Sequence, residues 1–161
     1  MAHKLSISLD RSSDSELDSM FVRIYDNYVR GEDYTISINV KNISSLPFPG
    51  GIVKDFWTEY LQTRGIEAHF RQYIKKEVPQ LKTGEQQNLG PAPWIPGVEG
   101  PGWFKVQVEA VDGQSVEYYR EVAGKVELEG SALWYTGFFV INRESVLIAK
   151  QLQDLKALLT K

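Results

Sequence analysis

Apolar and polar residues alternate along several stretches of this chain. In residues 34–40, an aromatic or branched aliphatic residue stands at every second position and a polar residue stands between each pair. Because successive side chains of a β-strand point to opposite faces, a period of two predicts a strand with one buried face. The same alternation recurs in residues 5–9, 66–74 and 104–110. The chain is therefore predicted to be mainly β.

Other segments have β character with weaker alternation. Residues 20–29, 115–123, 125–128 and 133–141 are rich in aromatic and branched residues and are bounded by turn signals. Asp112-Gly113, between two apolar runs, is a typical hairpin turn. These segments bring the predicted total to about seven to nine strands.

Residues 52–61 fit two interpretations. Phe56, Trp57, Tyr60 and Leu61 lie at helical spacing, but the segment is short and rich in aromatic residues. It is also preceded and followed by a glycine, which favours a strand over a helix.

Residues 91–102 contain four of the seven prolines and three glycines. Proline cannot donate a backbone hydrogen bond, so this segment is predicted to be a loop of about a dozen residues. Trp94 lies between two of these prolines on a stiff backbone. It is expected either to cover the end of the domain or to present its ring to a partner.

The period changes near the C-terminal end of the sequence. Ile148, Leu152, Leu155 and Leu159 follow one another at spacings of four, three and four, which predicts an amphipathic helix over residues 143–159. Asn142 or Ser145 can cap its start. An isolated helix of this length is marginal in water, so its apolar stripe is expected to be covered. The cover is the chain's own sheets, the same helix of a second copy, or another protein.

Together these patterns predict an immunoglobulin-like antiparallel β-sandwich over residues 1–141, followed by a C-terminal amphipathic helix over residues 142–161. The two sheets are expected to share a core that includes the inward-facing residues of two predicted strands, namely Ile36, Ile38, Val40, Phe104, Val106 and Val108.

Three local motifs resemble the bacterial and archaeal immunoglobulin-like modules called CARDB. They are the strand Tyr34–Asn42, the proline-leucine-glycine-glutamate corner Val78–Glu85, and the proline-glycine-aromatic opening Pro101–Val108 followed by Asp112-Gly113. The resemblance covers roughly residues 5–123. It implies a β-sandwich that binds or assembles, and it supplies no catalytic residues.

Composition narrows the chemistry. With no cysteine, the 161-residue chain has no disulfide and no thiol nucleophile, and it has only His3 and His69 as histidines. A zinc site needs three or four converging ligands, so no metal and no cofactor is predicted. Glu117, Glu121 and two further acids, Glu127 and Glu129, have the spacing of solvent-facing strand positions, so no catalytic residues and no enzyme activity are expected.

Charge and hydropathy bear on partners. The net charge of -3 argues against binding to nucleic acid, and no window of about 18 apolar residues predicts a membrane span. The first residues lack the apolar stretch of a signal peptide, which predicts a cytoplasmic location.

The predicted function is therefore a non-enzymatic protein-binding or assembly module. It is expected to bind a protein partner or to self-associate through the C-terminal helix. The candidate partner-binding residues are Trp94, Ile148, Leu152, Leu155 and Leu159. The alternative is a carbohydrate-binding module that stacks exposed aromatic rings on sugars, drawn from Trp57, Trp94, Trp103, Trp134, Tyr118, Tyr119 and Tyr135.

Overall fold

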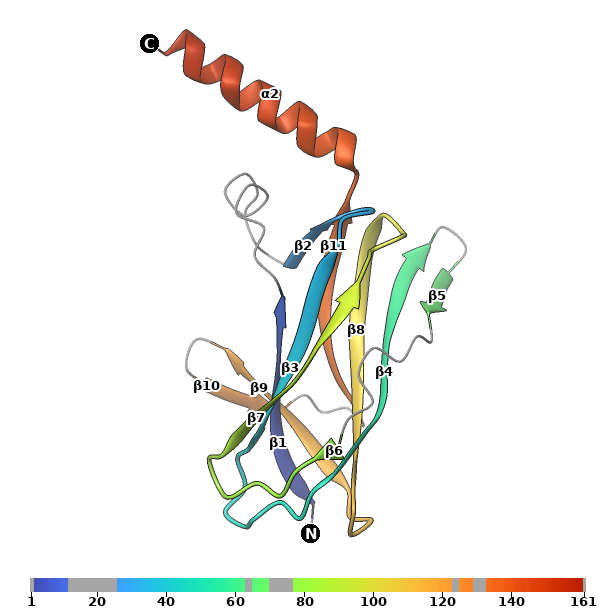
Figure 1. Cartoon of the computed structure of the whole chain (residues 1–161), viewed down its shortest axis with the longest axis vertical. Coiled ribbons are helices and arrows are strands. Elements are labelled where there is room, and N and C mark those ends of the chain that lie inside the picture. Colours follow the sequence, from blue (N-terminus) through green and yellow to red (C-terminus); the bar gives the residue numbers. More distant parts are fainter. Residues whose placement is uncertain are drawn as a thin grey trace.

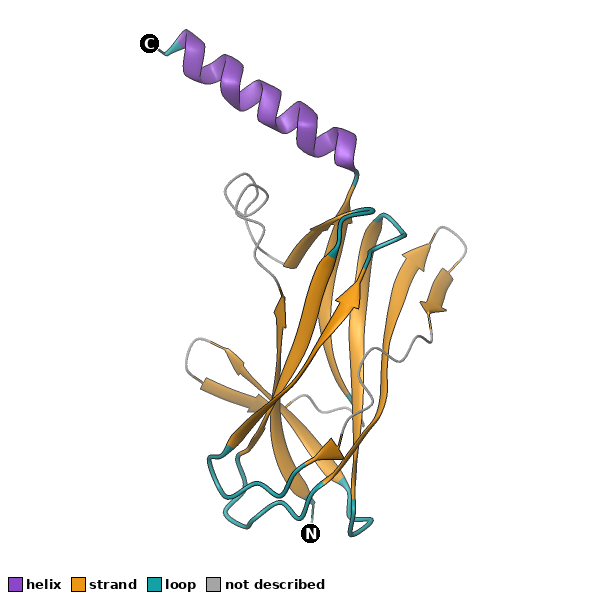
Figure 2. Cartoon of the chain, in the orientation of Figure 1, coloured by secondary structure: helices purple, strands orange, loops and turns teal. Residues whose placement is uncertain are grey.

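The computed structural model describes residues 2–11, 26–62, 65–69, 77–122, 125–128 and 133–160. Within these residues the chain forms eleven strands and one helix (Figures 1 and 2), which confirms the mainly β prediction. Parts of the predicted strands, residues 20–25 and 70–74, lie outside the described residues.

The strands form two packed sheets. The first has the order β10-β9-β1-β3-β7, with bounds β1 (His3–Arg11), β3 (Tyr34–Asn42), β7 (Gln86–Trp94), β9 (Val116–Val122) and β10 (Lys125–Leu128). The second has the order β2-β11-β8-β4-β5, with bounds β2 (Asp26–Val29), β4 (Gly51–Gln62), β5 (Gly65–His69), β8 (Gly100–Ala110) and β11 (Trp134–Ile141). The short strand β6 (Glu77–Val78) pairs with the start of β4.

The sandwich is not wholly antiparallel as predicted. Strand β1 runs parallel to β9, and β2 runs parallel to β11. The other pairings are antiparallel. A two-residue hairpin forces neighbouring strands to run in opposite directions, but these two pairs join segments distant in sequence, so either direction is open to them.

The core lies between the sheets and is rich in aromatic rings. All six residues predicted for it are buried, with exposed fractions of 0–5%: Ile36, Ile38, Val40, Phe104, Val106 and Val108. Aromatic residues from both sheets join them, including Tyr34 and Tyr118 from the first sheet and Tyr28, Phe56, Tyr60 and Phe138 from the second. Strand β3 alternates between buried and less buried positions along its whole length, as its sequence predicts.

The interpretation of residues 52–61 as a strand is confirmed. They form most of β4, which pairs along its length with β8 and at its two ends with β5 and β6. Phe56 and Tyr60 point into the core, whereas Trp57 and Leu61 lie on the outer face. Pairing on both sides outweighs the helical spacing of the aromatic residues.

The loop predicted for residues 91–102 is wrong. Strand β7 continues to Trp94, and β8 begins at Gly100. Strand β7 is the edge of its sheet, where a proline can leave its missing donor on the solvent side. Pro93 is therefore accommodated opposite Thr35 of β3. The connection that remains is residues 95–99.

Two of the resembling motifs meet at the end of the sandwich that carries the chain's first residues. The side chain of Asn42, which is 1% exposed, donates to the carbonyl oxygens of Leu81 at 3.0 Å and Leu46 at 2.9 Å. The backbone N–H of Gly84 donates to the Asn42 carbonyl at 2.7 Å. A buried asparagine with its polar groups paired thus ties the end of β3 to the turn after β6.

Candidate protein-interaction surfaces

The helix α2 (Arg143–Leu159) extends away from the sandwich beyond the end of β11 (Figure 1). It buries none of its residues. Its sequence is dominated by Leu, Lys, Gln and Ala, which favour helix, and the structure confirms the predicted bounds. Of the two predicted caps, the structure uses Asn142, whose side chain accepts from the Glu144 N–H at 2.7 Å.

Polar contacts hold the first turn of the helix against the sandwich. Asn142 Nδ2 donates to Glu99 Oε1 at 3.0 Å, and Arg30 pairs with the same carboxylate at 3.4 Å. Arg143 forms an ion pair with Glu32 in the turn between β2 and β3. We call this group, Arg30, Glu32, Glu99, Asn142 and Arg143, the polar joint. Exposed ion pairs add little stability, so its main effect is to set the direction in which the helix leaves.

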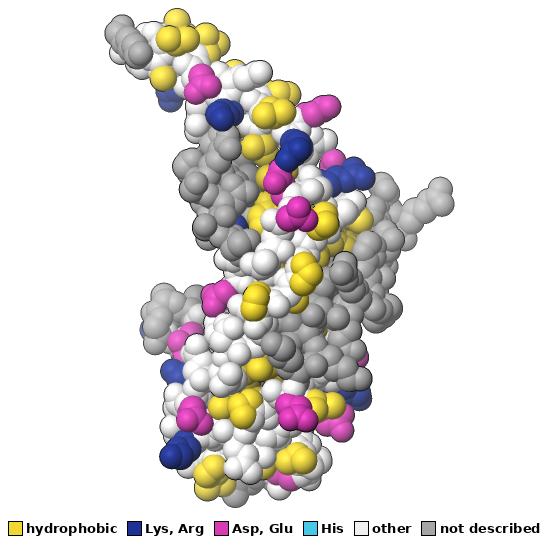
Figure 3. Space-filling model, in the orientation of Figure 1, with side chains coloured by type: hydrophobic (Ala, Val, Ile, Leu, Met, Phe, Trp, Pro, Cys, Tyr) yellow, Lys and Arg dark blue, Asp and Glu magenta, His cyan; other side chains and the backbone are white. Residues whose placement is uncertain are grey.

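The four predicted helical residues share one apolar stripe and are accessible. Ile148, Leu152, Leu155 and Leu159 are 53–78% exposed, and Figure 3 shows hydrophobic side chains following the helix. Leu147 and Leu158, which the sequence analysis missed, are exposed by 53% and 65%. At 100° per residue both flank the stripe on the same side, and a helical wheel of the sequence would have found them. We call these six residues the apolar stripe.

Trp94, the remaining predicted partner-binding residue, does not present its ring to solvent. It is 2% exposed, and its ring centroid lies 4.7 Å from that of Tyr28 and 4.8 Å from that of Phe104. Because β7 alternates, Ala92 and Trp94 face the core while Pro91 and Pro93 face outward. The structure therefore removes Trp94 from the candidate partner-binding surface.

The exposed aromatic residues that the structure describes lie instead on the outer face of the sheet that contains β4, β8 and β11. Leu61, Tyr135 and Phe139 are 39–47% exposed there, beside the half-buried Trp57 and Trp103. We call these five residues the aromatic face.

The strand register explains this grouping. Lys105 of β8 lies opposite Tyr135 on one side and Trp57 on the other, and Trp103 lies opposite Glu59. Lys105 and Glu59 form an ion pair in the middle of the aromatic face. Of the other aromatic residues named from the sequence, Tyr118 and Trp134 are buried and Tyr119 lies on the opposite sheet.

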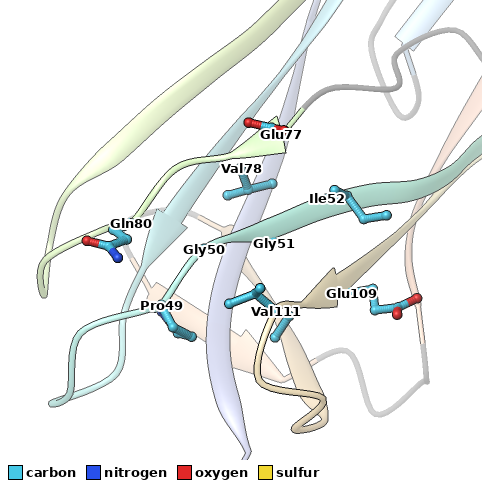
Figure 4. Close-up of a pocket in the computed structure, with 10 residues that line it drawn as sticks. Pro49, Gly50, Gly51, Ile52, Glu77, Val78, Gln80, Glu109 and Val111 are labelled. Atoms are coloured by element: carbon cyan, nitrogen blue, oxygen red, sulfur yellow. The ribbon is translucent and has the colours of Figure 1, made fainter.

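A hollow of about 540 Å³ opens at the far end of the sandwich from the helix (Figure 4). Its wall is largely the backbone where β4 begins and β8 ends, joined by the Val111 N–H donating to the Gly50 carbonyl at 2.9 Å. Glu77 and Glu109 lie on separate strands at different sides of the hollow. Glu109 Oε2 lies 3.9 Å from Lys54 Nζ. These carboxylates do not converge on a common point.

Histidine and serine also occur near the chain's first strand. His3 Nε2 lies 2.8 Å from Asp112 Oδ2. The backbone N–H of Gln114 donates to the Asp112 carboxylate and lowers its pKa. The hydrogen bond and the charge of His3 lower this pKa by a smaller amount. Ser44 lines a second hollow together with His3 and Asp112, but its hydroxyl donates to the Leu46 carbonyl at 2.6 Å and caps a turn. The arrangement is therefore that of a turn and not of a nucleophile with its base.

The other titratable residues named from the sequence, as far as the structure describes them, do not form a further cluster. Glu117 accepts from the Tyr119 hydroxyl at 2.9 Å, and Glu121 pairs with Lys41 at 3.4 Å. Glu129 and the side chain of His69 lie outside what the structure describes. Among the described residues, no three His, Asp or Glu side chains are grouped to hold a metal ion. In the same part of the chain no helix is long and apolar enough to cross a membrane.

Comparison with known proteins does not assign a family to this chain. No protein-family model matches the sequence, and no curated protein matches it. The resemblance to CARDB modules therefore remains a prediction from three short motifs.

Proposed function

We propose that this chain is a non-enzymatic protein-binding or assembly module that docks through the apolar stripe of its C-terminal helix. The observation that carries the proposal is an ordered amphipathic helix of 17 residues that buries none of them. The CARDB resemblance supports it, because such modules bind or assemble.

The energetics of the helix favour docking. A helix of this length is marginal in water by itself. Covering Ile148, Leu152, Leu155 and Leu159 would contribute about 1.5–3 kcal/mol for each side chain that becomes fully buried. That gain exceeds what the polar joint can supply from exposed charges.

The first test removes residues 145–161 and compares the mass in solution, measured by light scattering, with that of the full chain. We expect the full chain to form a larger species and the shortened chain to be monomeric. A lower melting temperature at unchanged mass would show instead that the helix stabilises its own sandwich. Unchanged mass and unchanged melting would end the proposal.

Paired substitutions separate the apolar stripe from the helix as a whole. Leu152→Glu with Leu155→Glu places two charges on the stripe, and we expect it to abolish assembly. Gln153→Glu with Ala157→Glu adds the same charge on the opposite side of the helix and serves as the control. Assembly that survives the first pair would contradict the assignment of the stripe.

Carbohydrate binding is the alternative, and the aromatic face favours it. Trp57, Trp103 and Tyr135 lie on one sheet surface, where flat rings can stack on the apolar faces of sugars. A screen of soluble glycans, followed by tryptophan fluorescence titration, tests this function. The alternative would be favoured if Trp103→Ala abolishes glycan binding and deletion of the helix leaves it unchanged.

A further inference from the structure

The aromatic face and the apolar stripe are two exposed apolar surfaces on one chain. We propose that the helix of one copy docks on the aromatic face of a second copy, and that the second copy's helix does the same in return. This inference rests on the proposed function and names both the partner and the receiving surface.

The helix cannot reach its own aromatic face as the joint stands. Only Asn142, with extended backbone at φ -64° and ψ 135°, separates the last residue of β11 from the first residue of the helix. To lie on its own sheet, the helix would have to reverse direction within one residue. It would also have to break the contacts of Asn142 with Glu99 and of Arg143 with Glu32. A second copy meets neither obstacle.

The two surfaces are comparable in extent and in chemistry. The apolar stripe is about 18 Å long from Leu147 to Leu159, and the aromatic face is about 13 Å long from Tyr135 to Phe139 along the backbone of β11, before the reach of its side chains is added. Leucine and isoleucine on one side would meet tryptophan, tyrosine, phenylalanine and leucine on the other. Lys105 and Glu59 pair within the aromatic face, so these two charges balance each other in the contact.

The area needed for a stable dimer favours two reciprocal contacts. A helix about 26 Å long and about 10 Å wide has a footprint of about 260 Å², so one helix–sheet contact hides about 520 Å² in total. Two contacts hide about 1,000 Å², which is the lower bound for a specific interface. Pairing of the two helices alone covers under two heptads and does not reach this area. Reciprocal exchange is also the symmetric, closed arrangement expected of a dimer.

The absence of native cysteine makes a direct test possible. Leu155→Cys is placed on one chain and Phe139→Cys on another, and the two proteins are mixed with a short thiol-reactive linker. We expect a cross-linked heterodimer, together with a doubled mass for the untreated full chain by light scattering. The control replaces Phe139→Cys with Leu128→Cys, which is 58% exposed on the opposite sheet and should not cross-link to the helix.

Three other outcomes would overturn the inference, and each leaves the proposed function in a different position. Cross-linking within one chain of the double variant at high dilution would show that the helix folds onto its own sandwich. Cross-linking of Leu155→Cys only to itself would show that helices pair with helices, which rejects the receiving surface and retains assembly through the stripe. A monomeric mass with no cross-link would reject a second copy as partner, and a monomeric full chain whose melting is also unchanged by deletion of residues 145–161 would end the proposed function as well.

Discussion

The ring of Trp94 is packed between the two sheets. It contacts the rings of Tyr28, Phe104 and Phe138, with the last centroid 5.4 Å away. Removing such a ring leaves a cavity, so we expect Trp94→Ala to lower the free energy of unfolding by about 3–5 kcal/mol. Its neighbour Ile95 is 54% exposed, and Ile95→Ala is the matched control, expected to cost under about 1 kcal/mol. Urea denaturation measures both, and equal effects would contradict a core position for Trp94.

The hydroxyl of Tyr118 makes two hydrogen bonds to one buried residue. The Val108 N–H donates to it at 2.8 Å, and it donates to the Val108 carbonyl at 3.1 Å. Burial raises the pKa of the Tyr118 hydroxyl above its ordinary value. An unfolded tyrosine ionises near pH 10 while the folded one stays neutral, so this contribution to stability is present below about pH 10 and is lost as the pH rises above it.

Replacing Tyr118 with phenylalanine tests this assignment. Tyr118→Phe should cost about 1–3 kcal/mol at neutral pH, because the Val108 N–H and carbonyl lose their partner. It should also make the fall in stability above pH 10 less steep than in the wild type. Urea denaturation across a pH series measures both effects, with Tyr135→Phe, at a residue 39% exposed, as the control. A variant that loses stability with pH as steeply as the wild type would contradict the assignment.

At the scale of elements, the helix depends on its cap and on nothing in the core. Asn142→Ala removes the acceptor for the Glu144 N–H and the hydrogen bond to Glu99. We expect it to destabilise the helix by about 0.5–2 kcal/mol and to leave the melting of the sandwich unchanged in the monomer. Hydrogen exchange of the helical amides measures the effect, and Ser145→Ala, one turn inside the helix, is the control. An equal loss of protection from hydrogen exchange in the strands would show that the helix and the sandwich unfold together.

At the scale of the whole molecule, reciprocal docking links stability to concentration. A partner that binds only the folded chain stabilises it by about 2.7 kcal/mol when present at 100 times its Kd. We therefore expect the melting temperature of the full chain to rise as the protein is concentrated over a hundredfold range. The melting temperature of the chain without residues 145–161 should not change over the same concentration range. A full chain whose melting temperature is also independent of concentration would argue against self-association.

The sequence predicts a good part of this architecture because the relevant patterns are local. The alternation in residues 34–40 identifies a strand and its buried face, and the spacing from Ile148 to Leu159 identifies the helix and its stripe. Each pattern depends only on the geometry of one element, with a period of two for strands and 3.6 for helices. For the same reason the core residues of β3 and β8 could be named in advance.

The position of each element among the others depends on contacts between segments that are distant in the sequence. Whether a proline such as Pro93 breaks a strand depends on whether that strand lies at an edge, and hydrogen bonds to a distant segment determine the edge. The fate of Trp94 follows from the same placement, because a ring on an edge strand faces either the core or solvent according to the register with β3. The aromatic face arises likewise from the pairing of three strands that are far apart in the chain. Local sequence patterns are thus enough to specify the elements and their apolar sides, whereas the pairing of distant strands specifies which of those sides are buried and which remain exposed.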